Sequence, residues 1–196
     1  MFLETICLLN GKVQNVDAHV KRMESTGSYY GFEPPELPEL EEMLTPGMDV
    51  NTKLKCSITY HTEINTIVFE HYEPLPVSTL KLVKASPDYA FKFADRTTLN
   101  ILMDKRAGCD QILIIRNGLV TDTTISNVVF SKDDDLFTPH LPLLNGTKRQ
   151  KLLKEGRIKE IEINVDNIKE YDKVYLINAL IDIEDNISLP VTQIFE

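Results

Sequence analysis

Four short segments of the 196-residue chain carry side chains that could bind or react with a ligand. They are AHVKR (18–22), KFADR (92–96), VTDTTISNVVF (120–130) and LLNGTKR (143–149). Together they contain an amine, a carboxylate, a guanidinium and a glycine at which a helix is expected to begin. Each feature alone has an ordinary explanation, because a lysine such as Lys92 is usually a surface residue and a helical arginine such as Arg22 usually forms a weak surface ion pair.

The order and spacing of these four segments resemble the class IV aminotransferase family, the pyridoxal-phosphate enzymes of fold type IV. The resemblance runs from Phe2 to about Val191, and its most specific part is Lys92 through Arg149. This family includes branched-chain and D-amino-acid aminotransferases and 4-amino-4-deoxychorismate lyase. The resemblance implies an α+β fold of two lobes, like that of D-amino-acid aminotransferase, with a small N-terminal α/β lobe and a larger β-rich C-terminal lobe.

The resemblance also implies a role for each functional residue. Lys92, four residues before Arg96 as in the family's K-x-x-[ND]-R pattern, would be the Schiff-base lysine. Arg22, in an H-x-x-R pattern with His19, would hold the cofactor phosphate. Asp122 stands where the family has a glutamate that pairs with the pyridine nitrogen. Further backbone N–H groups and hydroxyls for the phosphate would come from Ser126, Asn127, Thr147 and Lys148.

These residue types suit the chemistry of pyridoxal phosphate. An amine can form the covalent link to the cofactor and later move the substrate's α-proton. A carboxylate beside the ring nitrogen keeps that nitrogen protonated, so the ring can accept electrons. An arginine and a helix N-terminus bind a dianionic phosphate well, and Gly146 would let the backbone approach it closely.

The sequence also departs from the family pattern. The usual leading strand with its Gly-rich loop is missing, so we expect an abbreviated first lobe. Leu3 takes the place of an aromatic residue that borders the substrate pocket in aminotransferases. Tyr60 and His61 are candidates for substrate contact, although a polar hairpin turn explains them equally well. Asn178, in a segment that resembles the "NAL" segment of the lyase, either faces the pocket or caps its own strand end.

The pattern favours 4-amino-4-deoxychorismate lyase chemistry, which releases pyruvate and leaves 4-aminobenzoate for the folate pathway. One alternative is a class IV aminotransferase acting on branched-chain or D-amino acids, and another is a non-catalytic module that keeps only the cofactor-binding residues. The expected partners are a small-molecule amino substrate and a second copy of the chain in a homodimer, because family active sites draw on both subunits.

Composition excludes several other classes. A net charge of −9 and a pI near 5.0 disfavour binding to nucleic acid or to anionic membranes. The sequence contains neither an apolar run of about 18 residues nor a basic leader, so a cytoplasmic location is expected. The three cysteines lack metal-ligand spacing, so we expect free thiols and no metal site.

Hydrophobic periodicity and turn residues predict the elements that must position these side chains. An N-terminal lobe is expected over 1–73, a linker over 74–78 and a cofactor-binding lobe over 79–196. A tight turn is expected at Asn10-Gly11, and a loop at 46–51. Helices are expected over 18–30 (capped by Asp17), 34–45, 96–107 and from 146–147 to Gly156. Strands are expected over 2–9, 55–60, 66–72, 79–85, 111–115, 128–131, 136–138, 160–165, 173–177 and 187–191.

Overall fold

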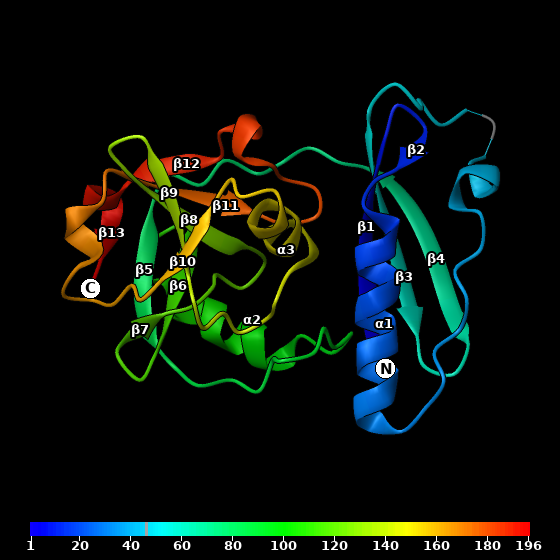
Figure 1. The fold of residues 1–196 in the computed structure, drawn as a ribbon, viewed down its shortest axis with the longest axis horizontal. Coiled ribbons are helices and arrows are strands. Elements are labelled where there is room, and N and C mark those ends of the chain that lie inside the picture. The colour runs from blue at the N-terminus through cyan, green and yellow to red at the C-terminus, as the bar shows by residue number, and fades with distance from the viewer. Residues whose placement is uncertain (46) are drawn as a thin grey trace. The chain divides into compact units, whose positions relative to one another are not determined.

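The computed structural model describes residues 1–45 and 47–196, which form two units (Figure 1). The first contains residues 1–73 and 91–95, and the second contains residues 74–90 and 96–196. The sequence analysis assigned residues 91–95 to the second lobe, and the structure corrects this. The Leu3 N–H donates to the Lys92 carbonyl at 2.9 Å, and the Ala94 N–H donates to the Met1 carbonyl at 3.2 Å. The segment that carries Lys92 is therefore fastened to the edge of the first unit's sheet.

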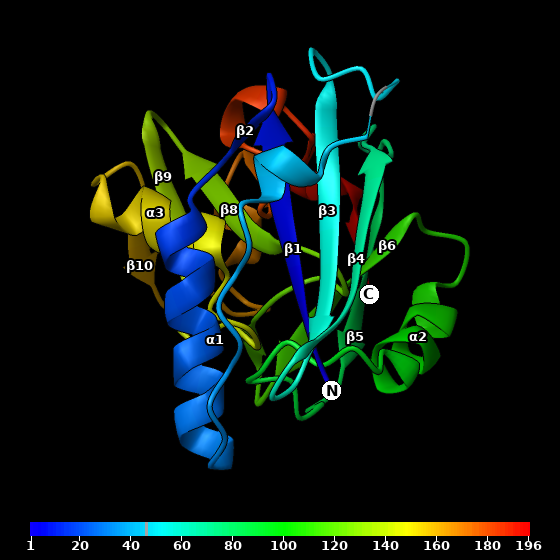
Figure 2. The ribbon, with the colours of Figure 1, turned by 90° about the vertical axis from the view of Figure 1, so that its right-hand side faces the viewer.

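The first unit is a four-stranded antiparallel sheet with one long helix. Its strand order is β2-β1-β3-β4. The strands are β1 (Phe2–Leu9), β2 (Lys12–Val13), β3 (Lys53–Tyr60) and β4 (Ile64–His71), and the helix is α1 (Val16–Tyr30). Alternate residues of β1 and β3 share one face of the sheet. On that face lie the buried Ile6, Leu8, Leu54, Cys56 and Ile58, and Figures 1 and 2 both draw α1 alongside β1.

Local chemistry explains which predictions for the first unit hold. The Asn10-Gly11 turn is confirmed, with φ values of 51° and 70°. Helix α1 begins at Val16 after Asn15 rather than behind an Asp17 cap. The helix expected over 34–45 is wrong except for the 3₁₀ turn η1 (Leu40–Met43), because its prolines lack an N–H and disfavour helical neighbours. The loop expected at 46–51 begins at residue 46, which lies outside the described residues.

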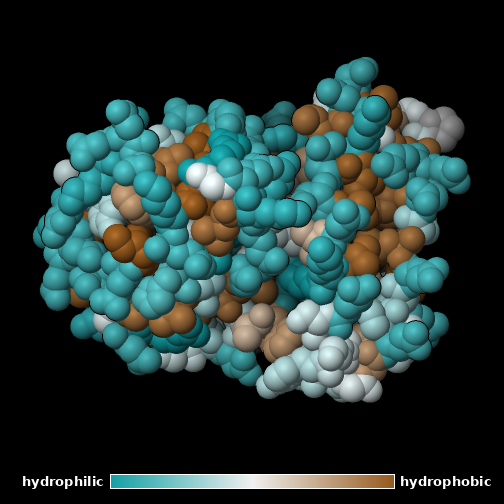
Figure 3. All heavy atoms as spheres, in the orientation of Figure 1, coloured by the Kyte–Doolittle hydropathy of each residue, from teal (hydrophilic) through white to brown (hydrophobic). Residues whose placement is uncertain are grey.

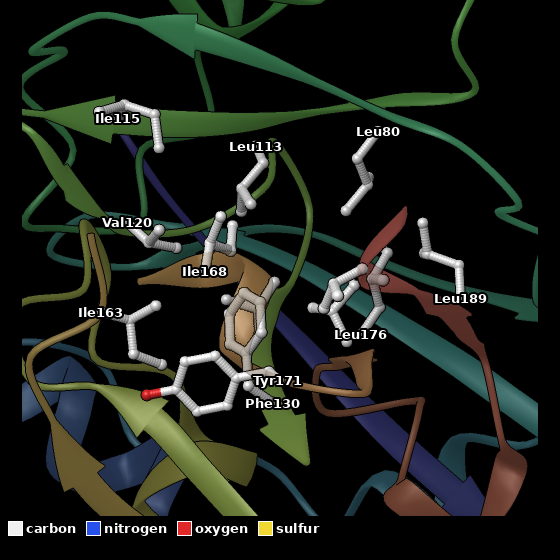
Figure 4. Packing of buried hydrophobic residues seen from close by; sticks show 13 residues of the cluster. Leu80, Leu113, Ile115, Val120, Phe130, Ile163, Ile168, Tyr171, Leu176 and Leu189 are labelled. Carbon is white, nitrogen blue, oxygen red and sulfur yellow. The ribbon is translucent and has the colours of Figure 1, made fainter. Parts of the chain in front are cut away.

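The second unit contains two sheets. One has the order β13-β5-β6-β7 and the other β10-β9-β8-β11-β12. The first is built from β5 (Leu80–Lys84), β6 (Gln111–Arg116), β7 (Leu119–Val120) and β13 (Ile194–Phe195). The second is built from β8 (Asn127–Lys132), β9 (Asp135–Pro139), β10 (Lys159–Ile161), β11 (Lys173–Ile177) and β12 (Ser188–Pro190). Residues from both sheets, including Leu80, Leu113, Phe130 and Leu176, form one hydrophobic core (Figure 4).

Helices complete the second unit. They are α2 (Thr97–Met103) with η2 (Asp104–Arg106), α3 (Thr147–Lys154), η3 (Ile168–Glu170), η4 (Ile183–Asp185) and η5 (Val191–Gln193). Leu152 of α3 packs with Val129 and Ile177 in a cluster separate from the main core. Because successive residues of a strand face opposite sides, β8 is covered on both faces, which explains its apolar run. The strand expected over 160–165 is only 159–161.

The predicted α+β class is confirmed by these elements. Figure 3 shows a largely hydrophilic surface interrupted by apolar areas near α1. A groove of about 580 Å³ lies between this helix and residues 31–37. The longest helix has 15 residues, and no helix within the described residues is long and apolar enough to span a membrane.

Candidate functional site

Strand β1 carries a buried carboxylate that the sequence analysis did not select. Glu4 is 0% exposed, and its Oε1 accepts a hydrogen bond from Arg22 Nε at 2.8 Å. Its Oε2 accepts from Arg22 Nη2 at 2.5 Å and lies 2.6 Å from His19 Nδ1. His19 and Arg22 are three residues apart on α1, so both side chains lie on the helix face that meets β1. Both residues of the H-x-x-R pattern thus contact the buried Glu4 carboxylate.

Strong electrostatic coupling accompanies these contacts. Burial alone would raise the pKa of Glu4, but the charge and hydrogen bonds of Arg22, with the help of His19, lower this pKa to about 2. Burial lowers the pKa of His19, while Glu4 opposes this shift; the positive charges of Arg22 and Lys92 lower it further. The charge of Lys92 therefore acts on His19. We call Glu4, His19, Arg22 and Lys92 the first-unit cluster.

Aromatic packing holds the Lys92 segment in the first unit. The flanking Phe91 and Phe93 rings lie 5.1 and 6.2 Å from the Tyr30 ring, centroid to centroid. Phe93 also stacks on Phe2 at 5.5 Å. These contacts add to the backbone hydrogen bonds of Lys92 and Ala94. The chain therefore positions this lysine from both sides.

The three substrate candidates of the first unit differ in position. Tyr60 is 1% exposed in the aromatic core, and burial raises its pKa to about 12. Its phenol lies in the aromatic core of the first unit, and a substrate contact at Tyr60 stays a prediction. His61 stacks on Phe32 with ring centroids 4.2 Å apart. Leu3 is half-buried and alternates with Glu4 along β1, so these two side chains lie on opposite faces of the sheet.

In the second unit, a tight turn brings Asp122 opposite Asn127. The Thr123 N–H donates to the Ser126 carbonyl at 3.0 Å, and the Ser126 N–H donates to the Thr123 hydroxyl at 2.9 Å. Such local hydroxyl bonds favour a turn over a continued strand. The sequence TTIS therefore folds back on itself just after β7, and an isolated bridge pairs Asp122 with Asn127.

The Asp122 carboxylate is 4% exposed and receives three hydrogen bonds. Asn127 Nδ2 donates to Oδ1 at 2.8 Å, and the Leu143 and Leu144 N–H groups each donate to Oδ2 at 2.9 Å. Burial raises the pKa of Asp122 to about 6 against the lowering effect of these donors. No ion pair to Asp122 occurs in the described part of the chain. The positive charge of Arg149 also acts on Asp122 and lowers its pKa. Oδ1 has a single donor, so it can accept a further hydrogen bond from a protonated ring nitrogen.

Asn127 also sets the start of helix α3. Its Nδ2 donates to the Leu144 carbonyl at 2.8 Å. A Cβ atom on Gly146, the residue before the helix, would lie 2.1 Å from Asn127 Oδ1. The sequence analysis explained this glycine by the approach of a cofactor phosphate. The structure shows that a side chain of the protein itself already requires it.

The remaining predicted phosphate and substrate residues of the second unit lie around this turn. Thr147 is buried at the first position of α3, and the Lys148 amine pairs with Asp182. Ser126 Oγ accepts a hydrogen bond from Asn178 Nδ2 at 3.1 Å. Asn178 Oδ1 in turn accepts from the N–H groups of residues 180 and 181, so it caps its own strand end as well as contacting Ser126.

Arg96 has a structural role beyond its place in the K-x-x-[ND]-R pattern. Arg96 Nη2 donates to the Thr124 carbonyl at 2.5 Å, and Nη1 donates to the Tyr89 hydroxyl at 3.0 Å. The Thr124 hydroxyl donates to Gln111 Oε1 at 3.0 Å. The arginine of the K-x-x-[ND]-R pattern thus fastens the turn that carries Asp122. The predicted residues therefore fall into two sets. The first unit holds Lys92, Arg22, Leu3, Tyr60 and His61, and the second unit holds Asp122, Ser126, Asn127, Thr147, Lys148 and Asn178.

Comparison with known proteins identifies the family. The family model of amino-transferase class IV matches residues 1–185. The chain belongs to this family. The family is dependent on pyridoxal phosphate in general.

Three relatives of this class IV family member are informative. An uncharacterised protein of Haemophilus influenzae is 37% identical over 180 residues, 90% of this chain and 96% of its own length. A Haemophilus somnus crystal structure, provisionally assigned as 4-amino-4-deoxychorismate lyase, is 32% identical with a TM-score of 0.81, covering 91% of this chain and 95% of that one. A hypothetical aminotransferase from Mycobacterium tuberculosis in its pyridoxal-phosphate-bound form shares the fold at 15% identity, with a TM-score of 0.68, covering 91% and 77%. These likenesses confirm the predicted fold type IV architecture.

Proposed function

We propose that this class IV aminotransferase family member binds pyridoxal phosphate through Lys92 and releases pyruvate from 4-amino-4-deoxychorismate, leaving 4-aminobenzoate. The observation that carries the cofactor assignment is Asp122, a buried carboxylate held by three N–H donors, with a single donor on its Oδ1. The lyase reaction is supported by the NAL segment at 178–180 and by the likeness to the Haemophilus somnus protein.

The chain's own groups divide the work of the reaction. Bound pyridoxal phosphate would supply a ring that accepts the electrons of a developing carbanion. The Lys92 amine would hold the cofactor and, once the substrate amine is bound, would move protons. The Asp122 carboxylate would keep the ring nitrogen protonated, since its negative charge stabilises the protonated form.

The family resemblance gives phosphate-binding roles to residues of each set. Arg22 would donate to the phosphate oxygens from the first-unit cluster. In the second unit, Thr147 and Lys148 lie in the first turn of α3, and a helix N-terminus directs N–H groups and a positive dipole end toward an anion. Residues 147 and 148 would present these groups, with the Ser126 and Thr147 hydroxyls and Asn127 beside them. A homodimer and a cytoplasmic location belong to the same proposal, and sedimentation of the purified protein checks the dimer.

Product analysis tests this function. The protein, loaded with pyridoxal phosphate, is incubated with 4-amino-4-deoxychorismate, and pyruvate and 4-aminobenzoate are quantified. We expect both products from the wild type and from Lys84→Ala, which removes an exposed lysine of β5, and neither from Lys92→Ala. Keto acid formed from a panel of L- and D-amino acids, without pyruvate release, would assign transamination instead. Failure of both reactions would leave the non-catalytic module as the better description.

A further inference from the structure

Glu4 is a buried ionised group to which the proposed function gives no task. Its two oxygens take part in three charge-assisted contacts, two with Arg22 and one with His19. Arg22 is 10% exposed at its side chain, so the guanidinium reaches the edge of the buried region while Glu4 remains inside. A buried carboxylate on a strand otherwise rich in apolar residues is costly unless it is paired in this way.

The geometry of the pair determines the orientation of the arginine. Donation from Nε to one carboxylate oxygen and from Nη2 to the other fixes the plane of the guanidinium. A long, flexible side chain that is ordered before its ligand arrives loses less freedom on binding. The Glu4 carboxylate thus orders the Arg22 side chain before a ligand binds, so the ligand does not have to order it.

We propose that Glu4 is a positioning residue, which orients Arg22 toward an incoming phosphate group before that group binds. This inference rests on the proposed function, in which Arg22 receives the phosphate of pyridoxal phosphate. The charged and titratable groups around Glu4 are His19 and Arg22 from α1, Lys92 from residues 91–95, and Tyr60 from β3.

Two effects of removing the Glu4 charge oppose each other. A neutral side chain would leave the positive charge of Arg22 less compensated, which favours an anion. The same change would release the guanidinium from its fixed plane, which disfavours the anion. The proposal states that the loss of orientation is larger, so Glu4→Gln must weaken phosphate binding.

The dissociation constant of pyridoxal phosphate, measured for four proteins, tests this claim. They are the wild type, Glu4→Gln, Arg22→Ala and the double variant. We expect Glu4→Gln to weaken binding about tenfold when Arg22 is present and to have no further effect when it is absent. Binding as tight as in the wild type, or tighter, would overturn the proposal. An equal loss in the Arg22→Ala background would also overturn it, because Glu4 would then not act through Arg22.

A matched variant separates positioning from packing. Ile58 lies directly across from Glu4 in the β1–β3 register and is fully buried. Ile58→Val should lower the melting temperature while leaving the dissociation constant unchanged. If it weakens binding as much as Glu4→Gln does, a general loss of packing explains the result and the proposal is wrong.

A measurement on the cofactor-free protein keeps this inference distinct from the proposed function. Nuclear magnetic resonance of the Arg22 guanidinium should show slow rotation in the wild type and fast rotation in Glu4→Gln. If wild type and Arg22→Ala bind pyridoxal phosphate equally, the phosphate role of Arg22 in the proposed function is wrong. Fast Arg22 rotation in the wild type would instead refute the Glu4 clamp itself.

Discussion

The contact between Gly146 and Asn127 makes a quantitative prediction about two substitutions. Gly146 has φ −66° and ψ 148°, which alanine adopts without strain, so the cost of Gly146→Ala is steric. The new Cβ would lie 2.1 Å from Asn127 Oδ1, against an ordinary contact of roughly 3.5 Å or more. The Asn127 amide must therefore move by more than about 1 Å.

That movement breaks two hydrogen bonds of 2.8 Å, one to Asp122 and one to the Leu144 carbonyl. A bond to a charged group contributes about 1.5–3 kcal/mol and a neutral one about 1 kcal/mol, so we expect Gly146→Ala to cost about 3 kcal/mol. Asn127→Ala removes the same two bonds and should cost about as much. In the double variant the space is already open, so the total should stay near 3 kcal/mol instead of reaching about 6 kcal/mol.

Urea denaturation of the four proteins measures these free energies of unfolding. Gly156→Ala provides the matched control, because Gly156 has φ +68° and open space around its Cβ position. Its cost of about 1–2 kcal/mol comes from the backbone alone and should add to that of Asn127→Ala. If the Gly146 and Asn127 costs also add, the steric explanation of this glycine is refuted.

Three further predictions concern charge and packing. Glu4 has its pKa lowered from 4.5 to about 2, so it stabilises the fold above pH 4.5 and this contribution is lost as the pH falls toward 2. Asp122 has its pKa raised from 3.8 to about 6, so its contribution is full below pH 3.8 and is lost as the pH rises through 6. The free energy of unfolding should therefore no longer fall between pH 4.5 and 2 because of Glu4 in Glu4→Gln, and no longer fall through pH 6 because of Asp122 in Asp122→Asn. A pH dependence equal to that of the wild type would contradict these assignments. Arg96→Ala should lower the free energy of unfolding, measured by urea denaturation, by about 1–2 kcal/mol. Arg96→Lys should be equally destabilised, because lysine lacks the planar guanidinium that donates to the Thr124 carbonyl and the Tyr89 hydroxyl together. Wild-type stability in Arg96→Lys would refute this role. Phe130→Ala, at a fully buried position, should cost about 3–5 kcal/mol in the same assay, and a cost below 1 kcal/mol would contradict its place in the core.

Elements of the fold that depend on short-range sequence signals could be predicted from the sequence. The largely apolar run of residues 2–9, ended by Asn10-Gly11, predicts β1 with the bounds that the structure shows, and Asn10-Gly11 predicts the turn that follows. Where one local signal competes with another, the prediction is less secure. The leucines and glutamates of 34–45 favour a helix, but the prolines among them prevent one.

The contacts that position the site depend on tertiary structure, so spacing alone could not reveal them. Glu4 is paired with residues 15 and 18 positions away, on a helix that packs against its strand. A lone carboxylate within the apolar run FLETICLL was the available signal. In the same way, Asn127 meets Gly146 across 19 positions of sequence, and the pairing of Lys148 with Asp182 joins two segments that no local pattern connects.

The central claim is that Lys92 is the residue to which pyridoxal phosphate is attached. The most direct test is to add pyridoxal phosphate to the purified protein, reduce it with borohydride, and identify the labelled peptide by mass spectrometry. We expect a single pyridoxyl group on Lys92, at an occupancy that falls sharply in Arg22→Ala. A label spread over exposed lysines such as Lys84, or none at all, would contradict it.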